Sequence, residues 1–167
     1  MMCLPGRIAA TGLAVALIGP VPSRADEVAL LPRVLGASEL FSADARSGTA
    51  LSGFDPVTYF TEKRPKVGVV GLEVMRDGLI WRFASSANRA AFLRDPEAFL
   101  PSIGGYDPLG ATRRVVVTSS PSIYAVRNGH LYLFRNEASR GAFLSDPELA
   151  AQAERIWPEL RGGLVKD

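Results

Sequence analysis

The alternation of apolar and polar positions predicts two β-hairpins. Asp77-Gly78 and Asn128-Gly129 are dipeptides that tolerate the positive φ of a two-residue turn, so each marks the tip of a hairpin. Behind each tip, every second residue shares one face of the predicted strand. These residues are Leu79, Trp81 and Phe83 after the first tip, and His130, Tyr132 and Phe134 after the second. Leu131 and Leu133 make the opposite face of the second strand apolar as well, so we expect that strand to be covered on both sides.

A helix is predicted after each hairpin. Ser85 and Asn136 are N-cap candidates, because their side-chain oxygens can accept a hydrogen bond from the first turn of a helix. The apolar stripes that follow are Ala87, Ala91 and Phe92 in the first helix, and Ala138, Ala142 and Phe143 in the second. Asp95-Pro96 and Asp146-Pro147 then predict the start of a further helical segment, and Pro158 should end the second of these segments.

An Asp-Pro pair also precedes each hairpin. An aspartate at this position accepts the free N–H groups of a first helical turn, and a proline behind it loses no hydrogen bond. Asp55 should therefore cap a short helix that runs through Phe60. Asp107 should cap a weaker turn, because Gly110 interrupts it.

These elements belong to a unit of about fifty residues that is present twice. Residues 76–97 align without a gap on residues 127–148 at an offset of 51, and residues 53–57 align on residues 105–109 at an offset of 52. So small a unit buries too little apolar surface to be stable alone. We therefore expect an α+β fold in which two pseudo-symmetric hairpin-plus-helix units share one core. Whether the hairpins form one sheet or two is left open.

The first 25 residues are typical of an export signal. Arg7 provides a basic start, residues 8–18 are apolar, and Ser23-Arg24-Ala25 follows as a cleavage region, so we expect cleavage and export, with the periplasm as the destination. The apolar run is shorter than the about 20 residues that span a bilayer, and retention as an anchor is the alternative. The predicted organisation is a signal peptide (1–25), an N-terminal arm (26–48), two repeats (49–102 and 103–160) and a C-terminal tail (161–167).

Removal of the signal peptide changes the charge and the chemistry of the chain. The chain has 19 basic and 17 acidic residues, and residues 1–25 contain two of the basic and none of the acidic ones, so the mature chain is formally neutral. Neutrality and the lack of a basic cluster argue against nucleic-acid binding. The single cysteine, Cys3, is also lost, which excludes a disulfide, a thiolate ligand and a cysteine nucleophile from the mature protein.

The motifs of the first unit resemble those of a known family. Asp55-Pro56-Val57, a hairpin, residues 83–92 (FASSANRAAF) and residues 95–99 (DPEAF) follow one another in the order of the YHS domain, a relative of the small treble-clef-like metal-binding TRASH domains. The resemblance covers residues 53–101, and a more degenerate second copy covers residues 105–158. The whole resembles exported bacterial proteins that carry an extended YHS domain.

The resemblance also implies where metal ligands would stand. Metal-binding members of the wider group have cysteines at three positions after the Asp-Pro pair. The corresponding residues are Thr58, Ala84 and Asn88 in the first copy, and Gly110, Arg135 and Ser139 in the second. None of them can replace a thiolate at a soft-metal site. We therefore expect the scaffold of the family without its zinc, copper or iron chemistry, and no cofactor.

Four residues are candidates for a binding surface near the junction of the two units: Asp55, Tyr106, Asp107 and Arg113. The competing role of the two aspartates is helix capping. Two alternatives stay open for them. They could hold a hard cation together with His130, or they could form an acid–base pair. His130 is the only histidine and has no partner at metal-ligand spacing, which favours a structural or incidental role.

These features predict an exported, non-enzymatic binding or interaction module whose partner is a protein or a small ligand. A periplasmic carrier that holds a metal or small ligand through carboxylates is one alternative, and a carboxylate-dependent enzyme is another. The chain has no Gly-x-Ser-x-Gly elbow, no G-x-G-x-x-G loop and no Walker-type loop. Hydrolase and nucleotide-binding functions therefore have no motif to support them, and the sequence indicates neither the oligomeric state nor the identity of the partner.

Overall fold

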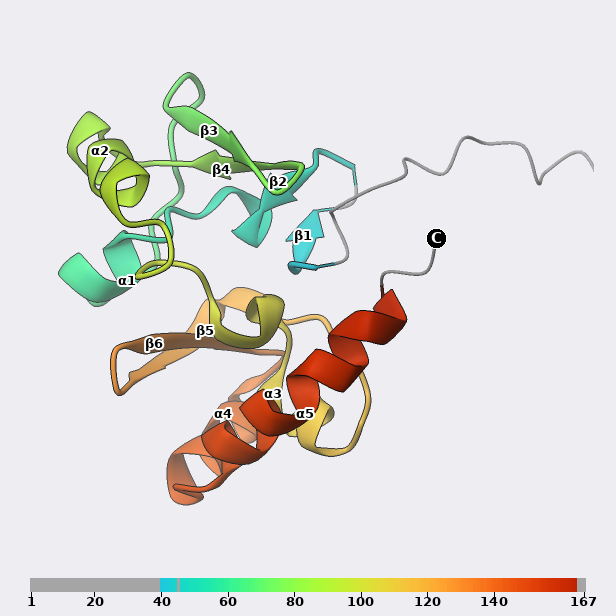
Figure 1. Cartoon of the computed structure of the whole chain (residues 1–167). Helices are drawn as coiled ribbons and strands as arrows, with labels where there is room; N and C mark the ends of the chain where they lie inside the picture. The colour runs from blue at the N-terminus through green and yellow to red at the C-terminus, as the bar shows by residue number, and fades with distance from the viewer. Residues whose placement is uncertain (1–39, 45, 165–167) are drawn as a thin grey trace, which may run out of the picture. The chain divides into compact units, whose positions relative to one another are not determined.

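The computed structural model describes residues 40–44 and 46–164 (Figure 1). The expected signal peptide, residues 26–39 of the expected arm and residues 165–167 lie outside the described residues. The strands are β1 (Ala43–Asp44), β2 (Thr49–Ala50), β3 (Glu73–Arg76), β4 (Leu79–Arg82), β5 (Ser120–Arg127) and β6 (His130–Phe134). The helices are α1 (Thr58–Thr61), α2 (Ser86–Arg94), α3 (Pro108–Thr112), α4 (Glu137–Ser145) and α5 (Leu149–Leu164). The fold is α+β, as the sequence predicts.

The described strands form two separate sheets, which answers the question that the sequence leaves open. One sheet has the order β1-β2-β4-β3, and the other consists of β5 and β6 alone. β2 lies parallel to β4 through the pairing of Thr49 with Ile80, and β1 is antiparallel to β2. The end of the predicted arm is therefore part of a sheet, since β1 lies within residues 26–48.

Both predicted hairpins and both predicted helix starts are confirmed. β3 pairs with β4 around Asp77-Gly78, and β5 pairs with β6 around Asn128-Gly129; both residues of each turn have positive φ. In α2 the Ser85 side chain accepts a hydrogen bond from the backbone N–H of Asn88, and in α4 the Asn136 side chain accepts one from Ser139. Each helix buries one phenylalanine of its predicted stripe, whereas the alanines of the stripe are exposed or partly buried.

The structure corrects two details of the Asp-Pro segments that precede the hairpins. α1 begins at Thr58, so the Asp55 side chain bonds to the turn before the helix rather than capping the helix itself. Gly110 does not interrupt the second segment, because α3 runs through it. A Cβ on Gly110 would lie 2.8 Å from a side-chain carbon of Val117, so a glycine allows the following loop to pack against this helix.

The later Asp-Pro segments differ from the prediction as well. Residues 95–100 form only turns and bends. Pro158 does not end the second segment, since α5 continues through it to Leu164. A proline inside a helix removes one hydrogen bond to the carbonyl four residues earlier. Here Pro158 and Glu154, which carries that carbonyl, both lie at exposed positions, so water can solvate the carbonyl. Buried residues of the first turns, among them Leu149 and Ala153, hold the helix in place.

Strand β6 is buried on both faces, as its sequence predicts, and it joins the core clusters. Leu131 and Leu133 pack into one cluster with Leu79, Trp81 and Phe92 of the first half of the chain. Tyr132 and Phe134 point the other way and pack against α4 and the start of α5, which lie together on one side of the β5–β6 hairpin in Figure 1. His130 is the exception on this face, because it is exposed.

An arginine from each following helix binds the outer strand of its hairpin. The Nε of Arg89 donates a hydrogen bond to the carbonyl of Glu73 in β3, and the Nε of Arg140 donates one to the carbonyl of Tyr124 in β5. Unpaired carbonyls at a sheet edge can recruit further strands. Each arginine therefore occupies one edge acceptor and fixes its helix to its hairpin.

Candidate functional site

The carboxylate of Asp55 is fully buried and accepts three hydrogen bonds. Its Oδ1 accepts from the backbone N–H of Val57 at 2.8 Å. Its Oδ2 accepts from the backbone N–H of Ala84 at 2.7 Å and from the Nδ2 of Asn88 at 2.6 Å. Ala84 follows β4, and Asn88 lies in the first turn of α2. The carboxylate thus binds the start of α2 and the end of the hairpin to the segment before α1.

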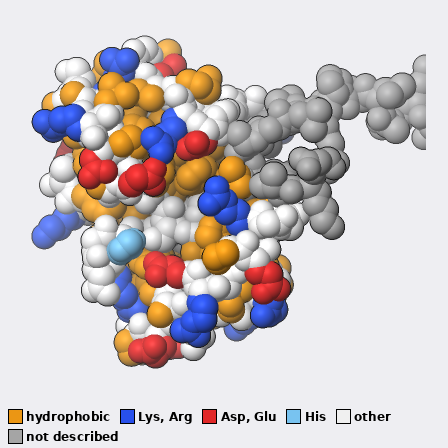
Figure 2. Space-filling view, viewed as in Figure 1, with side chains coloured by type: hydrophobic (Ala, Val, Ile, Leu, Met, Phe, Trp, Pro, Cys, Tyr) orange, Lys and Arg blue, Asp and Glu red, His pale blue; other side chains and the backbone are white. Residues whose placement is uncertain are grey.

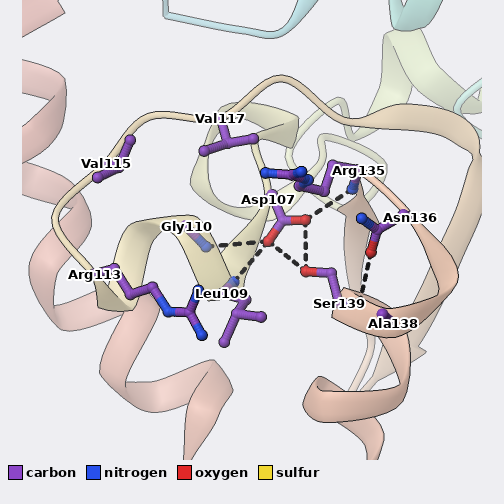
Figure 3. Close-up of a pocket in the computed structure, with 10 residues that line it drawn as sticks. All are labelled: Asp107, Leu109, Gly110, Arg113, Val115, Val117, Arg135, Asn136, Ala138 and Ser139. Carbon is purple, nitrogen blue, oxygen red and sulfur yellow. Dashed lines mark hydrogen bonds between the residues drawn. The ribbon is translucent and has the colours of Figure 1, made fainter.

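Asp107 occupies the same position in the second half of the chain, with 1% of its surface exposed. Its Oδ1 accepts from the backbone N–H groups of Leu109 at 2.8 Å and Gly110 at 3.1 Å, which makes it the N-cap of α3. Its Oδ2 accepts from the backbone N–H of Arg135 at 2.8 Å. The hydroxyl of Ser139 lies 2.7 Å from Oδ1 and 2.6 Å from Oδ2 (Figure 3). Four donors therefore converge on this carboxylate.

The two carboxylates have partners at matching sequence positions. Ala84 and Arg135 are 51 residues apart, as are Asn88 and Ser139, and both pairs donate to the aspartate of their own copy. These are positions at which the resemblance implies cysteines. The remaining two, Thr58 and Gly110, also bind the local aspartate: the Thr58 hydroxyl donates to the Asp55 carbonyl, and the Gly110 N–H donates to the Asp107 carboxylate.

Sequence reasoning found the capping role of Asp107 but missed the donors from the hairpin and from the following helix. A capping bond links neighbours in the chain, whereas the bonds from Ala84 and Arg135 each span nearly thirty residues. One signal was available. Asn88 and Ser139 keep a polar side chain at matched positions of otherwise helical segments, and each is a donor that a buried carboxylate can use.

A pocket of about 410 Å³ opens beside Asp107 (Figure 3). Its lining comes from α3, from the loop that follows α3 and from the start of α4. The lining residues are Asp107, Leu109, Gly110, Arg113, Val115, Val117, Arg135, Asn136, Ala138 and Ser139. Two of the four predicted binding residues, Asp107 and Arg113, thus line one pocket. Asp55 and Tyr106 are not among its lining residues. Arg135 was missed as a pocket residue, although it replaces Ala84 of the first copy.

Tyr106 precedes the pocket in the chain and is buried. Its ring centroid lies 5.6 Å from that of Trp157, so it contributes to the contact between α5 and the segment before α3.

His130 lies at the exposed start of β6, and the single histidine is visible on the surface in Figure 2. Its Nδ1 is 3.5 Å from the hydroxyl of Ser102. Asp55, Asp107 and His130 all belong to the described residues, and among these residues no group of three or more His, Cys, Asp or Glu side chains is placed to hold a metal ion. The structure therefore does not bring the alternative metal ligands together.

Two tyrosine hydroxyls have perturbed acidities. Burial raises the pKa of Tyr59 above its ordinary value, and its hydroxyl donates to the carbonyl of Pro121 at 2.7 Å. Burial and the hydrogen bond to Glu154, at 2.5 Å, raise the pKa of Tyr132 to about 12. Both hydroxyls are therefore protonated donors at neutral pH, which suits them to hold the structure together rather than to act as bases.

Comparisons with family models, with curated proteins and with solved structures gave no match to this chain. Across residues 40–44 and 46–164, none of the helices has the length and apolar character needed to cross a bilayer. Acidic and basic side chains are interspersed on the face shown in Figure 2.

Proposed function

We propose that this protein is an exported, non-enzymatic binding module built from two tandem, cysteine-free YHS-like units. The matched hydrogen bonds of Asp55 and Asp107 support the tandem arrangement, because each aspartate binds the hairpin end and the helix start of its own unit. In this proposal the buried carboxylate stabilises the scaffold at the place where metal-binding relatives would use cysteine ligands.

The observation that carries the binding role is the pocket beside Asp107. Its volume of about 410 Å³ falls within the range of small-ligand sites, and its lining combines apolar side chains with a few polar groups. Some lining residues occupy positions that both copies keep, such as Asp107 and Ala138, whereas Gly110, Arg113 and Arg135 lie at positions where the copies differ. Residues that both copies keep serve the common fold, so a function specific to one copy belongs where the copies differ.

The hydrogen bonding of both aspartates favours binding over catalysis. A general acid or base must exchange a proton with the substrate, and a nucleophile must reach it. The oxygens of Asp55 accept three hydrogen bonds within the fold, and those of Asp107 receive four donors. Removing these bonds for a chemical step would leave buried backbone donors without a partner, at a cost of about 1–3 kcal/mol for each.

Native mass spectrometry of the protein purified from the periplasmic fraction tests this function. The proposal expects a chain cleaved after residue 25 that retains one non-covalent partner, which denaturation releases. After incubation with fresh protein and a second release, the partner should have the same mass as before, because a binding module does not convert its ligand. Turnover that Asp107→Asn abolishes, while the circular dichroism spectrum stays the same, would refute the non-enzymatic role. An uncleaved chain in the membrane fraction would refute export as a free protein.

A further inference from the structure

Two guanidinium groups line the pocket beside Asp107, and neither has an ion-pair partner among the described residues. Arg113 stands at the C-terminal end of α3, and Arg135 follows β6. Within the described part of the chain, neither guanidinium has a hydrogen bond or an ion pair, and both residues are exposed. The neighbouring arginines differ in this respect. Arg114 forms an ion pair with Glu159, and Arg140 forms one with Glu137.

The net charge at the pocket favours a ligand with one negative charge. Asp107 contributes one negative charge and the two arginines contribute two positive charges. The Asp107 carboxylate is covered by its four donors, so an entering anion meets the guanidinium groups first. A planar guanidinium binds a carboxylate through paired N–H groups, and two of them from different elements can hold one carboxylate between them.

The rest of the lining favours an organic ligand over an inorganic anion. Leu109, Val115, Val117 and Ala138 supply an apolar wall, and Val115 is 53% exposed. Burying the exposed valine side chain against an apolar group of the ligand would contribute favourable free energy to binding. The wall is held in place by close packing, because a Cβ on Gly110 would meet Val117 at 2.8 Å and the Val115 carbonyl at 3.0 Å. The pocket is therefore formed before a ligand arrives.

The first copy lacks this arrangement. Ala84 stands where the second copy has Arg135, although both residues donate their backbone N–H to the aspartate of their copy. The guanidinium of Arg135 is thus an addition to a structural position, and its side chain is free to serve a ligand.

We infer that the pocket binds a small organic monocarboxylate, with the carboxylate held between Arg113 and Arg135 and the apolar body against Leu109, Val115 and Val117. This inference rests on the proposed binding function and specifies the ligand class of that same site.

The test is a titration of the full signal-cleaved protein with hexanoate, monitored by calorimetry and by ¹H–¹⁵N NMR. Hexanamide is the neutral probe of the same shape, and inorganic phosphate is the anion without an apolar body. Hexanoate should bind with a dissociation constant of about 0.1–1 mM, and its shifts should centre on the amides of Gly110, Val117 and Ser139. Hexanamide and phosphate should each bind at least tenfold more weakly. Equal binding of hexanamide, or tighter binding of phosphate, would overturn the inference.

Variants identify the residues. Arg113→Gln and Arg135→Gln should each weaken hexanoate binding about tenfold, since each removes a charged hydrogen-bonding partner. Arg114→Gln is the matched control, because Arg114 is outside the lining and already forms an ion pair with Glu159. The affinity of this variant for hexanoate should stay within twofold of that of the unmodified protein. Arg113→Gln and Arg135→Gln change exposed side chains only, so the backbone N–H of residue 135 still donates to Asp107. Unchanged affinity in either lining variant would refute the assignment, as would an equal loss in the control.

The outcomes separate this inference from the function on which it rests. Failure of hexanoate to bind, while the protein from periplasm retains another partner, would refute only the monocarboxylate class. Conversion of the bound probe to product, lost in Asp107→Asn with the fold unchanged, would refute the non-enzymatic function, whatever the affinity for carboxylates.

Discussion

The two buried carboxylates should make large and nearly equal contributions to stability, and Asp55→Asn and Asp107→Asn test this. Asparagine has the same shape but presents an NH₂ group in place of one carboxylate oxygen. At Asp107 the Ser139 hydroxyl can reverse its direction and accept from that NH₂ group. At Asp55 the Asn88 amide can turn and do the same. A backbone N–H cannot reverse its direction, and each of the two oxygens of both carboxylates accepts from at least one backbone N–H. Whichever way the asparagine amide is turned, its NH₂ group therefore faces at least one backbone donor.

The magnitude follows from these contacts. A buried donor left without its acceptor costs about 1–3 kcal/mol. The remaining hydrogen bonds change from a charged to a neutral acceptor, and charged bonds are roughly twice as strong. Together these changes predict a loss of about 2–4 kcal/mol in the free energy of unfolding for each variant. Since domains of this kind are stable by about 5–15 kcal/mol, both variants should fold, whereas Asp55→Ala or Asp107→Ala removes every acceptor and should approach complete unfolding.

Urea denaturation followed by tryptophan fluorescence measures the change, because Trp81 and Trp157 report on the first and second halves of the chain. Asp146→Asn is the matched control. Its carboxylate also belongs to an Asp-Pro pair but, among the described residues, accepts only from the N–H of Glu148. Asparagine caps as well as aspartate, so the change should stay within about 0.5 kcal/mol. A change below about 0.5 kcal/mol in Asp55→Asn or Asp107→Asn would refute the structural role of the carboxylate.

Three further outcomes are expected from stability measurements. Because the pKa of Tyr59 is raised in the folded protein, the unfolded chain releases the phenol proton at lower pH than the folded chain does. The contribution of Tyr59 to stability is therefore complete below about pH 10 and is lost as the pH rises above that value. Tyr59→Phe should make the decline in stability above about pH 10 shallower in urea melts. Gly110→Ala should destabilise the protein by about 1–3 kcal/mol through its steric contact, whereas Gly141→Ala, a helical position with open space, should stabilise it by about 0.5–1 kcal/mol. Leu133→Ala should cost about 2–5 kcal/mol and leave one transition for both tryptophans; two separate transitions would contradict a cluster shared by both halves.

Local sequence patterns predicted the elements whose geometry depends on neighbours in the chain. The hairpin tips at Asp77-Gly78 and Asn128-Gly129 need positive φ, which these residues tolerate, and the N-caps Ser85 and Asn136 bond within one helical turn. The continuous apolar strand from Leu131 to Phe134 also revealed its burial, because apolar residues on both faces require cover on both sides.

Patterns failed where a distant contact decides the structure. Pro158 would end an isolated helix, but the packing of the preceding turns against the core holds α5 together. Gly110 would weaken an isolated turn, but the loop that passes over α3 needs the space that a glycine leaves. The strand order of the first sheet depends on β2, a strand of two residues that pairs with β4 and is too short to carry a recognisable pattern.

The contrast between Ala84 and Arg135 explains how one scaffold can carry different sites. The structural role of both residues uses the backbone N–H, which every residue except proline possesses, so the side chain can change without loss of the hydrogen bond to the carboxylate. Asn88 and Ser139 contribute through their side chains and must therefore remain donors. The second copy can thus place a cation in the lining of a pocket while Asp107 continues to hold the fold. Under the proposed binding role, the ligand preference can therefore change there at little cost in stability.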